Sequence, residues 1–254
     1  MEGVGKMPQK KFYRSRAHCN PLAHNTGFKY PLHPKEMDWS PYYPQLTDPV
    51  VRHLDVGCGF GGLTIALATL FPEKVVLGLE IRAKVCEYVR RRIQVLREES
   101  ENQSYLNASC FRTNCMRYLP NYFECGQLEK IFFCFPDPHF KAKNHRRRIV
   151  SESMLNEYAY LLQPGGRLYT ITDVEDLHNW HVEKCTNHPY FERISDEELN
   201  SDPCIPAMIN ETEEGKKVSR MNGNKYYAVF RRRTNEETSN KLIENSPVFT
   251  LFLK

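Results

Sequence analysis

The sequence lacks the features that mark membrane, secreted and metal-binding proteins. No apolar segment approaches the roughly 20 residues that a membrane helix needs, and the first residues lack the apolar run of a secretory signal. The nine cysteines include no CxxC pair and no Cys/His cluster. No internal repeat and no second domain are visible. With 254 residues, 41% hydrophobic and 26% charged, the sequence predicts one large intracellular globular domain with free, buried thiols and no metal.

Positive charge is concentrated in two short segments, although the net charge is only +4. Residues 1–30 carry six Lys/Arg, Arg16 among them, against a single acid. Residues 141–148 carry five, including Lys141 and Arg146, and no acid. A single run of this kind is usually a solvated face or a localisation signal. Two runs beside one candidate pocket favour phosphate contacts along a nucleic acid.

Strand and helix patterns alternate from Val50 onward. The expected strands are residues 51–56, 75–79, 109–112, 131–135, 167–172, 191–194 and 226–231, and the expected helices lie within 63–70, 85–96, 150–162 and 174–185. This order predicts an α/β, Rossmann-like fold, with a mostly parallel seven-stranded sheet and helices on both faces. The expected organisation is a basic, mostly irregular N-terminal extension (1–49), the α/β domain (50–233) and a poorly ordered C-terminal tail (234–254).

Unusual residues follow four successive predicted strands, at the sheet edge where such folds bind ligands. A glycine-rich turn that includes Gly57 and Gly59 follows the first strand and opens a helix. Glu80 closes the second strand, Asn114 follows the third, and Asp137 follows the fourth. We therefore expect a cofactor site at this edge, with Glu80 placed to accept hydrogen bonds from ribose hydroxyls.

The glycine turn alone leaves the cofactor open. Gly57, Gly59 and Gly62 satisfy the GxGxxG frame of nicotinamide enzymes. Asp55, followed by glycines at 57, 59 and 61, equally satisfies the acidic-GxGxG frame of S-adenosylmethionine-dependent transferases. A ligand-free turn is a third possibility, since tight strand-to-helix turns favour glycine.

Asp137 favours the methyl donor over the nicotinamide cofactor. It lies between Pro136 and Pro138, and proline restricts both its own backbone and that of the preceding residue. A carboxylate on a stiff turn, immediately before the basic run at 141–148, suggests catalysis on a polyanion. A dinucleotide enzyme gives no reason for that arrangement.

Several motifs, in order, resemble those of the tRNA (guanine-N7)-methyltransferases, specifically the eukaryotic catalytic subunit. The motifs are Arg16-Ala17-His18, Met37-Asp38-Trp39-Ser40, Leu79-Glu80-Ile81-Arg82, Phe135 to Lys141, Ile171-Thr172-Asp173 and Thr212 to Lys217. The resemblance runs from about Arg14 to Arg233. It implies a class I methyltransferase fold that uses S-adenosylmethionine to methylate a guanosine in the tRNA variable loop. It also implies a non-catalytic WD-repeat β-propeller partner and a location in the nucleus, possibly also the cytoplasm.

The resemblance assigns roles to individual positions. It implies an S-adenosylmethionine site lined by Gly57, Glu80, Arg82, Asn114, Cys115 and Cys134, with Thr212 and Glu214 closing over it. Asp137 matches the active-site acid, and Lys141 and Asp173 match positions that hold the substrate. Arg16 and Arg146 are expected to bind the substrate as well, and Gly59 the cofactor. Each position except Asp137 has a structural alternative: core thiols for the cysteines, helix caps for Thr212, Glu214 and Asp173, and a surface charge for Arg82.

Guanine N7 limits what the acid has to do. N7 is a lone pair with no proton to lose, so no general base is needed. Methylation leaves positive charge on the purine, and Asp137 is expected to orient the base and stabilise that charge. Enzymes that methylate exocyclic amines resemble a different pattern, in which a second proline stands where this chain has His139. The remaining alternatives are an inactive RNA-binding subunit of the same fold and a nicotinamide-dependent oxidoreductase.

Two regions depart from the family pattern. The chain is short between Tyr43 and Arg52, where relatives often carry a lysine-rich insertion. Residues 234–254 match nothing in the family; they begin polar and end apolar, and we expect them to be poorly ordered.

Overall fold

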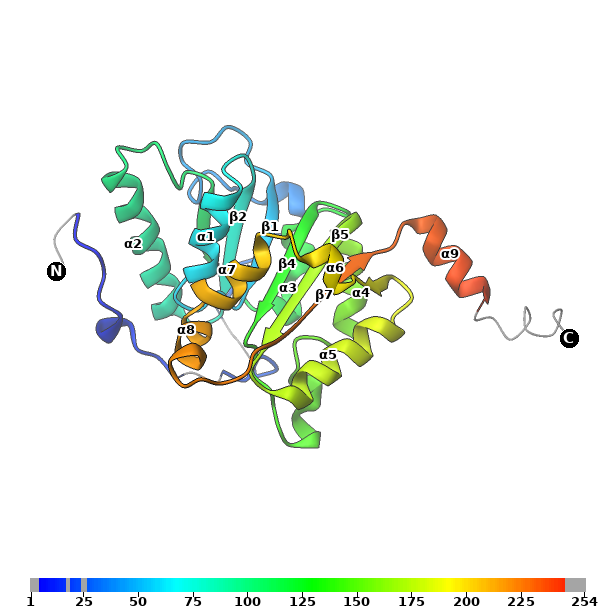
Figure 1. Cartoon of the computed structure of the whole chain (residues 1–254). Helices are drawn as coiled ribbons and strands as arrows, with labels where there is room; N and C mark the ends of the chain where they lie inside the picture. The colour runs from blue at the N-terminus through cyan, green and yellow to red at the C-terminus, as the bar shows by residue number, and fades with distance from the viewer. Residues whose placement is uncertain (1–4, 17–18, 24–26, 245–254) are drawn as a thin grey trace, which may run out of the picture.

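The computed structural model describes residues 5–16, 19–23 and 27–244 (Figure 1). The strands are β1 (Val51–Val56), β2 (Val75–Glu80), β3 (Ala108–Arg112), β4 (Leu128–Cys134), β5 (Leu162–Thr172), β6 (Phe191–Arg193) and β7 (Tyr226–Arg232). The α-helices are α1 (Gly62–Leu70), α2 (Ala83–Glu99), α3 (Cys115–Tyr122), α4 (Glu152–Leu161), α5 (Glu175–Asn187), α6 (Asp196–Leu199), α7 (Cys204–Glu211), α8 (Glu213–Arg220) and α9 (Asn235–Glu244). Three 3-10 helices, η1 (Lys10–Tyr13), η2 (Pro34–Glu36) and η3 (Ala142–Arg147), complete the described part of the chain.

The seven strands form one sheet in the order β3-β2-β1-β4-β5-β7-β6. The neighbours from β3 to β5 are parallel, and β7 is antiparallel to both β5 and β6. This confirms the predicted mostly parallel sheet. The winding direction changes between β1 and β4, where the crossovers leave the carboxyl ends of neighbouring strands facing a common crevice.

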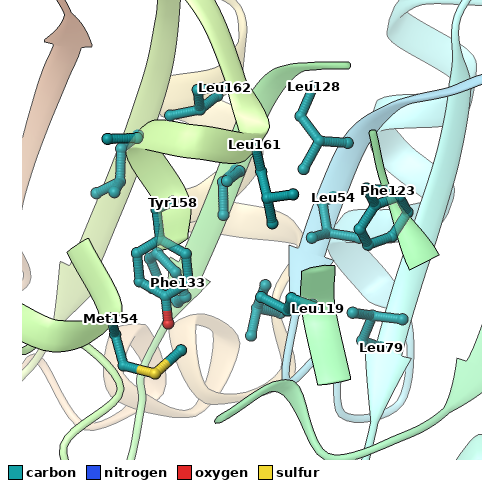
Figure 2. Close-up of a cluster of buried hydrophobic side chains, with 14 of the residues drawn as sticks. Leu54, Leu79, Leu119, Phe123, Leu128, Phe133, Met154, Tyr158, Leu161 and Leu162 are labelled. Atoms are coloured by element: carbon teal, nitrogen blue, oxygen red, sulfur yellow. The ribbon is translucent and has the colours of Figure 1, made fainter. Parts of the chain in front are cut away.

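Two apolar clusters cover the two faces of the sheet. The first packs α3 and α4 against β1, β2, β4 and β5; Figure 2 shows Leu119 and Phe123 on one side of it and Tyr158 and Leu161 on the other. The second packs α1, α2, α6 and α7 against the opposite face. Because helices cover both faces, the central strands are almost continuously buried. Their apolar runs made them readable from sequence.

Several helices were not expected. No helix was expected at 115–122, and Pro120 lies inside the one that is present. The helix forms nevertheless: Asn114 caps its first turn by accepting a hydrogen bond from the N–H of Met116, and Leu119 anchors it in the core. The short helices α6 to α8 were also missed. Strand β5 begins at Leu162, five residues before the expected start, since Leu162 pairs with Leu128 across an irregularity that precedes the regular ladder.

The ends of the chain are packed to different extents. Residues 28–46 follow the face that carries α3: Tyr30 stacks on Tyr118, and the buried Tyr43 donates a hydrogen bond to the carbonyl of Val76. Residues 235–244, which belong to the segment expected to be poorly ordered, form α9. Arg231 pairs with Glu237 at the start of that helix, and the side chain of Thr238 is buried. Residues 245–254, which include the expected apolar end, lie outside the described residues.

Candidate functional site

A cavity lies at the carboxyl ends of β1, β2, β3 and β4. Its lining includes seven residues that the sequence predicted for the site: Gly57, Glu80, Arg82, Asn114, Cys115, Cys134 and Asp137. They come from four strand ends that are far apart in sequence and adjacent in the sheet. The structure therefore brings these residues together at one edge of the sheet, as the sequence predicted.

The glycine turn gives the cavity a backbone floor. Gly57 has φ +74°, and its N–H donates to the carbonyl of Leu79 over 2.8 Å, which ties the turn to β2. A Cβ added at Gly57 would meet no protein atom within 4 Å, so the glycine leaves open space at the cavity wall. Gly62 is glycine for another reason: an added Cβ would lie 1.9 Å from the carbonyl oxygen of Glu211, at the end of α7.

The buried carboxyl group of Asp55 links the two elements on either side of the glycine turn. Asp55 is almost fully buried on β1 and accepts a 2.7 Å hydrogen bond from the hydroxyl of Thr64 on α1. Burial raises the pKa of Asp55 to about 7, while the hydrogen bond from Thr64 opposes part of that rise. Asp55 therefore joins the strand before the turn to the helix after it.

Glu80 and Arg82 form a two-pronged ion pair at the end of β2. Arg82 donates from Nε to Oε1 of Glu80 over 3.0 Å and from the guanidinium to Oε2 over 2.8 Å. The backbone N–H of Arg82 also donates to Oε1. This pair fixes a carboxylate that is only 3% exposed. Oε1 accepts two of these hydrogen bonds and Oε2 one, so Oε2 retains a lone pair that a ligand hydroxyl can use.

Asn114, Cys115 and Cys134 form another part of the wall. The amide nitrogen of Asn114 donates to the carbonyl of Pro21 over 2.7 Å, which brings the N-terminal segment to the cavity. Burial raises the thiol pKa of both Cys115 and Cys134, so both remain neutral at physiological pH. In the neutral form these thiols act as apolar wall surface.

Asp137 lies at the far side of the cavity on a constrained turn. The residues on either side of the Pro136-Asp137-Pro138 segment, Phe135 and His139, have φ of +51° and +46°. Bulky residues rarely adopt this left-handed conformation, and surrounding contacts have to maintain it. The N–H of Phe135 donates to the carbonyl of Ile171 on β5 over 2.8 Å. The side chain of Asp137 is 30% exposed, so a ligand can reach it.

Three residues expected to bind the cofactor are not part of the cavity lining. Gly59 lies in the glycine turn with φ +55°. Thr212 caps α8 by accepting a 3.0 Å hydrogen bond from the N–H of Gly215, and Glu214 is exposed and pairs with Lys217. Thr212 therefore caps a helix, as in the structural alternative given for it above. Thr212 still lies close to the turn, since its Cα would be 3.7 Å from a Cβ added at Gly62.

The residues expected to hold the substrate are not part of the cavity lining. Lys141, Arg146, Arg16 and Asp173 are all exposed. Asp173 does not cap α5, whose first turn has no side-chain cap. Of the motif that begins at Arg16, the two following residues lie outside the described part of the chain.

Several residues that line the cavity were not singled out from the sequence, among them Arg147, Cys19 and Pro21. Arg147, next to the predicted Arg146, points into it, and its buried Nε has no hydrogen-bond partner in the described structure. The basic run signalled a cation here, but the 3-10 turn of η3 decides which cation faces inward. Cys19 and Pro21 reach the cavity through the fold of the N-terminal segment. No local sequence pattern indicates that contact.

Among residues 5–16, 19–23 and 27–244, no group of His, Cys, Asp and Glu is arranged to hold a metal ion. Within the same residues, each helix is too short or too polar to cross a membrane.

The cavity fits a nucleoside-containing methyl donor. Open space beside Gly57 allows close approach of a ligand to the backbone, and Oε2 of the buried Glu80 can accept a ribose hydroxyl. Apolar atoms of Leu79, Ile81 and Met116 add surface for a flat ring. Asp137 lines the same cavity as Gly57 and Glu80.

Comparisons with known proteins agree with this site. A family model described as "Putative methyltransferase" matches residues 49–228. The tRNA (guanine-N(7)-)-methyltransferase of Drosophila mojavensis is 52% identical over 232 residues, covering 90% of this chain and 93% of that protein. The same-named proteins of Aedes aegypti and Lodderomyces elongisporus are 50% and 51% identical and cover 89% and 92% of this chain. They span 92% and 78% of those relatives.

A solved structure shares the fold at low sequence similarity. The 16S rRNA methyltransferase KamB has a TM-score of 0.50 and 14% identity, covering 77% of this chain and 93% of that chain. That likeness concerns the fold alone. The assignment to a family comes from half-identical relatives over nine-tenths of the chain and from the family model. The chain belongs to the tRNA (guanine-N7)-methyltransferase family of class I, S-adenosylmethionine-dependent enzymes.

Proposed function

We propose that this protein transfers a methyl group from S-adenosylmethionine to N7 of a guanosine in the variable loop of tRNA. The observation that carries the proposal is the single cavity that joins Gly57 and Glu80 on one side to Asp137 on the other. The side with Gly57 and Glu80, the donor half, suits a nucleoside. The side with Asp137, the acid half, is followed in the chain by a cluster of cations. Family membership supplies the substrate class.

The donor half positions a reactive group without reacting itself. Glu80, held by Arg82, accepts hydrogen bonds from the ribose, and the glycine turn allows backbone contact. Bound there, S-adenosylmethionine supplies an electrophilic methyl group on a positively charged sulfur. Alignment of nucleophile, methyl carbon and sulfur contributes several kcal/mol on proximity arguments. The neutral thiols Cys115 and Cys134 do not compete for the methyl group, because a thiol is a much weaker nucleophile than a thiolate.

Asp137 acts on the base. Its carboxylate accepts hydrogen bonds from the donors on the Watson–Crick edge of guanine, and so fixes the position of N7. As the methyl group arrives, positive charge spreads over the purine and those donors become more acidic. The carboxylate therefore binds the transition state better than the neutral base, which is how it accelerates transfer. No proton has to leave N7, so Asp137 is not needed as a base.

The cations around the cavity provide a surface for the RNA backbone. Lys141, Lys143 and Arg146 are exposed on the segment that follows Asp137. Phe140, in the same segment, is 73% exposed, and an exposed aromatic ring among cations suits stacking on an unpaired base. Extruding a base costs a few kcal/mol, and the phosphate contacts offset that cost.

The test is a transfer assay that identifies the modified atom. Purified protein is incubated with tRNA and isotopically labelled donor, and the product nucleoside is identified by mass spectrometry and mapped by cleavage at 7-methylguanosine. We expect label at one variable-loop guanosine, and none when that guanosine is replaced by adenosine. Donor binding and tRNA binding without transfer would indicate the inactive subunit instead, and label on an exocyclic amine would refute N7 as the target.

A WD-repeat β-propeller partner and a nuclear location are further parts of the proposal. Both rest on the family resemblance alone. Running the assay with and without a co-purified β-propeller subunit tests the partnership; equal activity with and without it would refute a requirement for the partner. Microscopy of the tagged chain tests the location.

A further inference from the structure

The Asp137 turn is held by a second contact, which comes from Arg148. Arg148 donates from Nε to the carbonyl of Pro138 over 2.9 Å. Pro138 directly follows Asp137 and precedes the strained His139. The turn is thus fixed at two points: the N–H of Phe135 to β5, and the carbonyl of Pro138 to Arg148.

Arg148 is itself fixed by an aromatic ring on α5. Its guanidinium carbon lies 4.6 Å from the centre of the Trp180 ring, and the residue is only 6% exposed. The indole N–H of Trp180 donates to the carbonyl of Val150 over 2.8 Å, which ties α5 to the chain just after Arg148. His145 contacts the same ring edge-on at 5.2 Å. Figure 1 shows this segment, in green, next to α5.

This environment separates Arg148 from its neighbours in the basic run. Arg146 is exposed and Arg147 lines the cavity, whereas Arg148 is buried between Trp180 and the backbone of the active-site turn. A buried guanidinium with this contact pattern is poorly placed to reach a phosphate. Its hydrogen bond goes to the backbone of the turn, and its stacking on Trp180 fixes the guanidinium that makes this bond.

We propose that Arg148, stacked on Trp180, is a positioning residue that holds the Asp137 turn in its catalytic conformation. The inference rests on the proposed role of Asp137, and it identifies the contact that holds the Asp137 turn in place. Two positive-φ residues beside the acid make the turn costly to maintain, so the turn needs contacts that keep it in place. Arginine suits the position because a planar group can stack on the indole and donate from its edge at once, which lysine does not do.

The first experiment compares Arg148→Lys with wild type in the full-length protein, together with the partner subunit if the assay requires it. The readouts are kcat, KM for tRNA, donor affinity by calorimetry and the thermal midpoint. We expect kcat to fall by roughly 10-fold or more, in line with the sensitivity of catalysis to small misplacements. Donor affinity should stay unchanged, because the Glu80 side of the cavity is not touched. KM for tRNA should change little.

Arg146→Met is the contrast within the same run. It removes an exposed cation, so we expect a higher KM for tRNA and a weaker salt dependence of binding, with little change in kcat. If Arg148→Lys behaved like Arg146→Met, Arg148 would be an RNA contact and the positioning role would be refuted. Full kcat in Arg148→Lys would refute it as well.

A second variant covers the case in which Arg148→Lys folds poorly. Trp180→Phe keeps an aromatic ring but loses the N–H bond to Val150. We expect a smaller fall in kcat with the same unchanged donor affinity, and wild-type kcat there would overturn the proposal. In the double variant, the loss should be less than the product of the two single losses, since both act through one contact. If wild-type protein itself transferred no methyl group, the proposed function would fail first, which separates the two outcomes.

Discussion

Two glycines five positions apart predict different consequences for the same substitution. In Gly62→Ala, the new Cβ would lie 1.9 Å from the carbonyl oxygen of Glu211. No flexible side chain can move aside there, so α1 and α7 have to separate. Overpacking of this kind costs about 1–3 kcal/mol or more. At about 2–4 °C per kcal/mol for a chain of this size, the thermal midpoint should fall by roughly 2–12 °C.

In Gly57→Ala, the new Cβ meets no protein atom within 4 Å, and the cost comes from φ +74° alone, about 1–2 kcal/mol. That Cβ faces the donor side of the cavity, so affinity for S-adenosylhomocysteine should fall by about 10-fold or more, equal to about 1.4 kcal/mol. Gly126→Ala is the matched control, because Gly126 has φ +65° outside the cavity. Thermal unfolding and calorimetry measure both effects. A Gly62→Ala protein with the wild-type midpoint, or a Gly57→Ala protein with wild-type affinity, would refute the reasoning.

Two further predictions concern Glu80 and a buried histidine. Glu80→Gln removes the charge that pairs with Arg82 and accepts the ribose, so donor affinity should fall by roughly 10-fold to 100-fold, as expected for a lost charged hydrogen bond; unchanged affinity by calorimetry would contradict the assigned contact. Burial lowers the pKa of His181 to about 3 from an ordinary value near 6.5, so the unfolded chain gains a proton first as the pH falls and the folded state loses stability. Between pH 7.5 and 5, protonation of this histidine in the unfolded chain should lower the free energy of unfolding of wild type by about 2 kcal/mol. The pH falls about 1.5 units below the ordinary pKa near 6.5, and each unit contributes about 1.4 kcal/mol. Denaturant unfolding of His181→Leu should show that pH-dependent difference, and parallel pH curves for the two proteins would refute it.

The sequence was sufficient to predict those site residues that lie at the ends of strands. Continuous apolar runs located β1, β2 and β4, and each was followed by its glycine turn or acid, so these runs alone placed Gly57, Glu80 and Asp137 at one edge of the sheet. The alternation of strands and helices also predicted the sheet. These signals are local, and burial on both faces makes them strong.

Tertiary contacts decided the rest. Packing against the core stabilises α3 despite Pro120, and α9 is fixed by the pairing of Arg231 with Glu237. The choice of Arg147 over Arg146 as the cavity residue depends on the turn of η3. The approach of Pro21 to Asn114 joins positions 93 residues apart, and the support of the Asp137 turn by Arg148 depends on a ring from α5. Such contacts join residues that are far apart in the sequence, and local sequence patterns do not reveal them.

Single-turnover methyl transfer by Asp137→Asn tests the central claim most directly. The exchange is nearly isosteric, so it removes the charge while preserving the turn, and saturating donor and tRNA isolate the chemical step. The rate should fall on the order of 100-fold, typical of a lost electrostatic contact to the transition state, while donor affinity stays within error of wild type. Asp196→Asn, in the first turn of α6 away from the cavity, serves as the control and should keep the wild-type rate. A rate for Asp137→Asn within a few-fold of wild type would contradict the account.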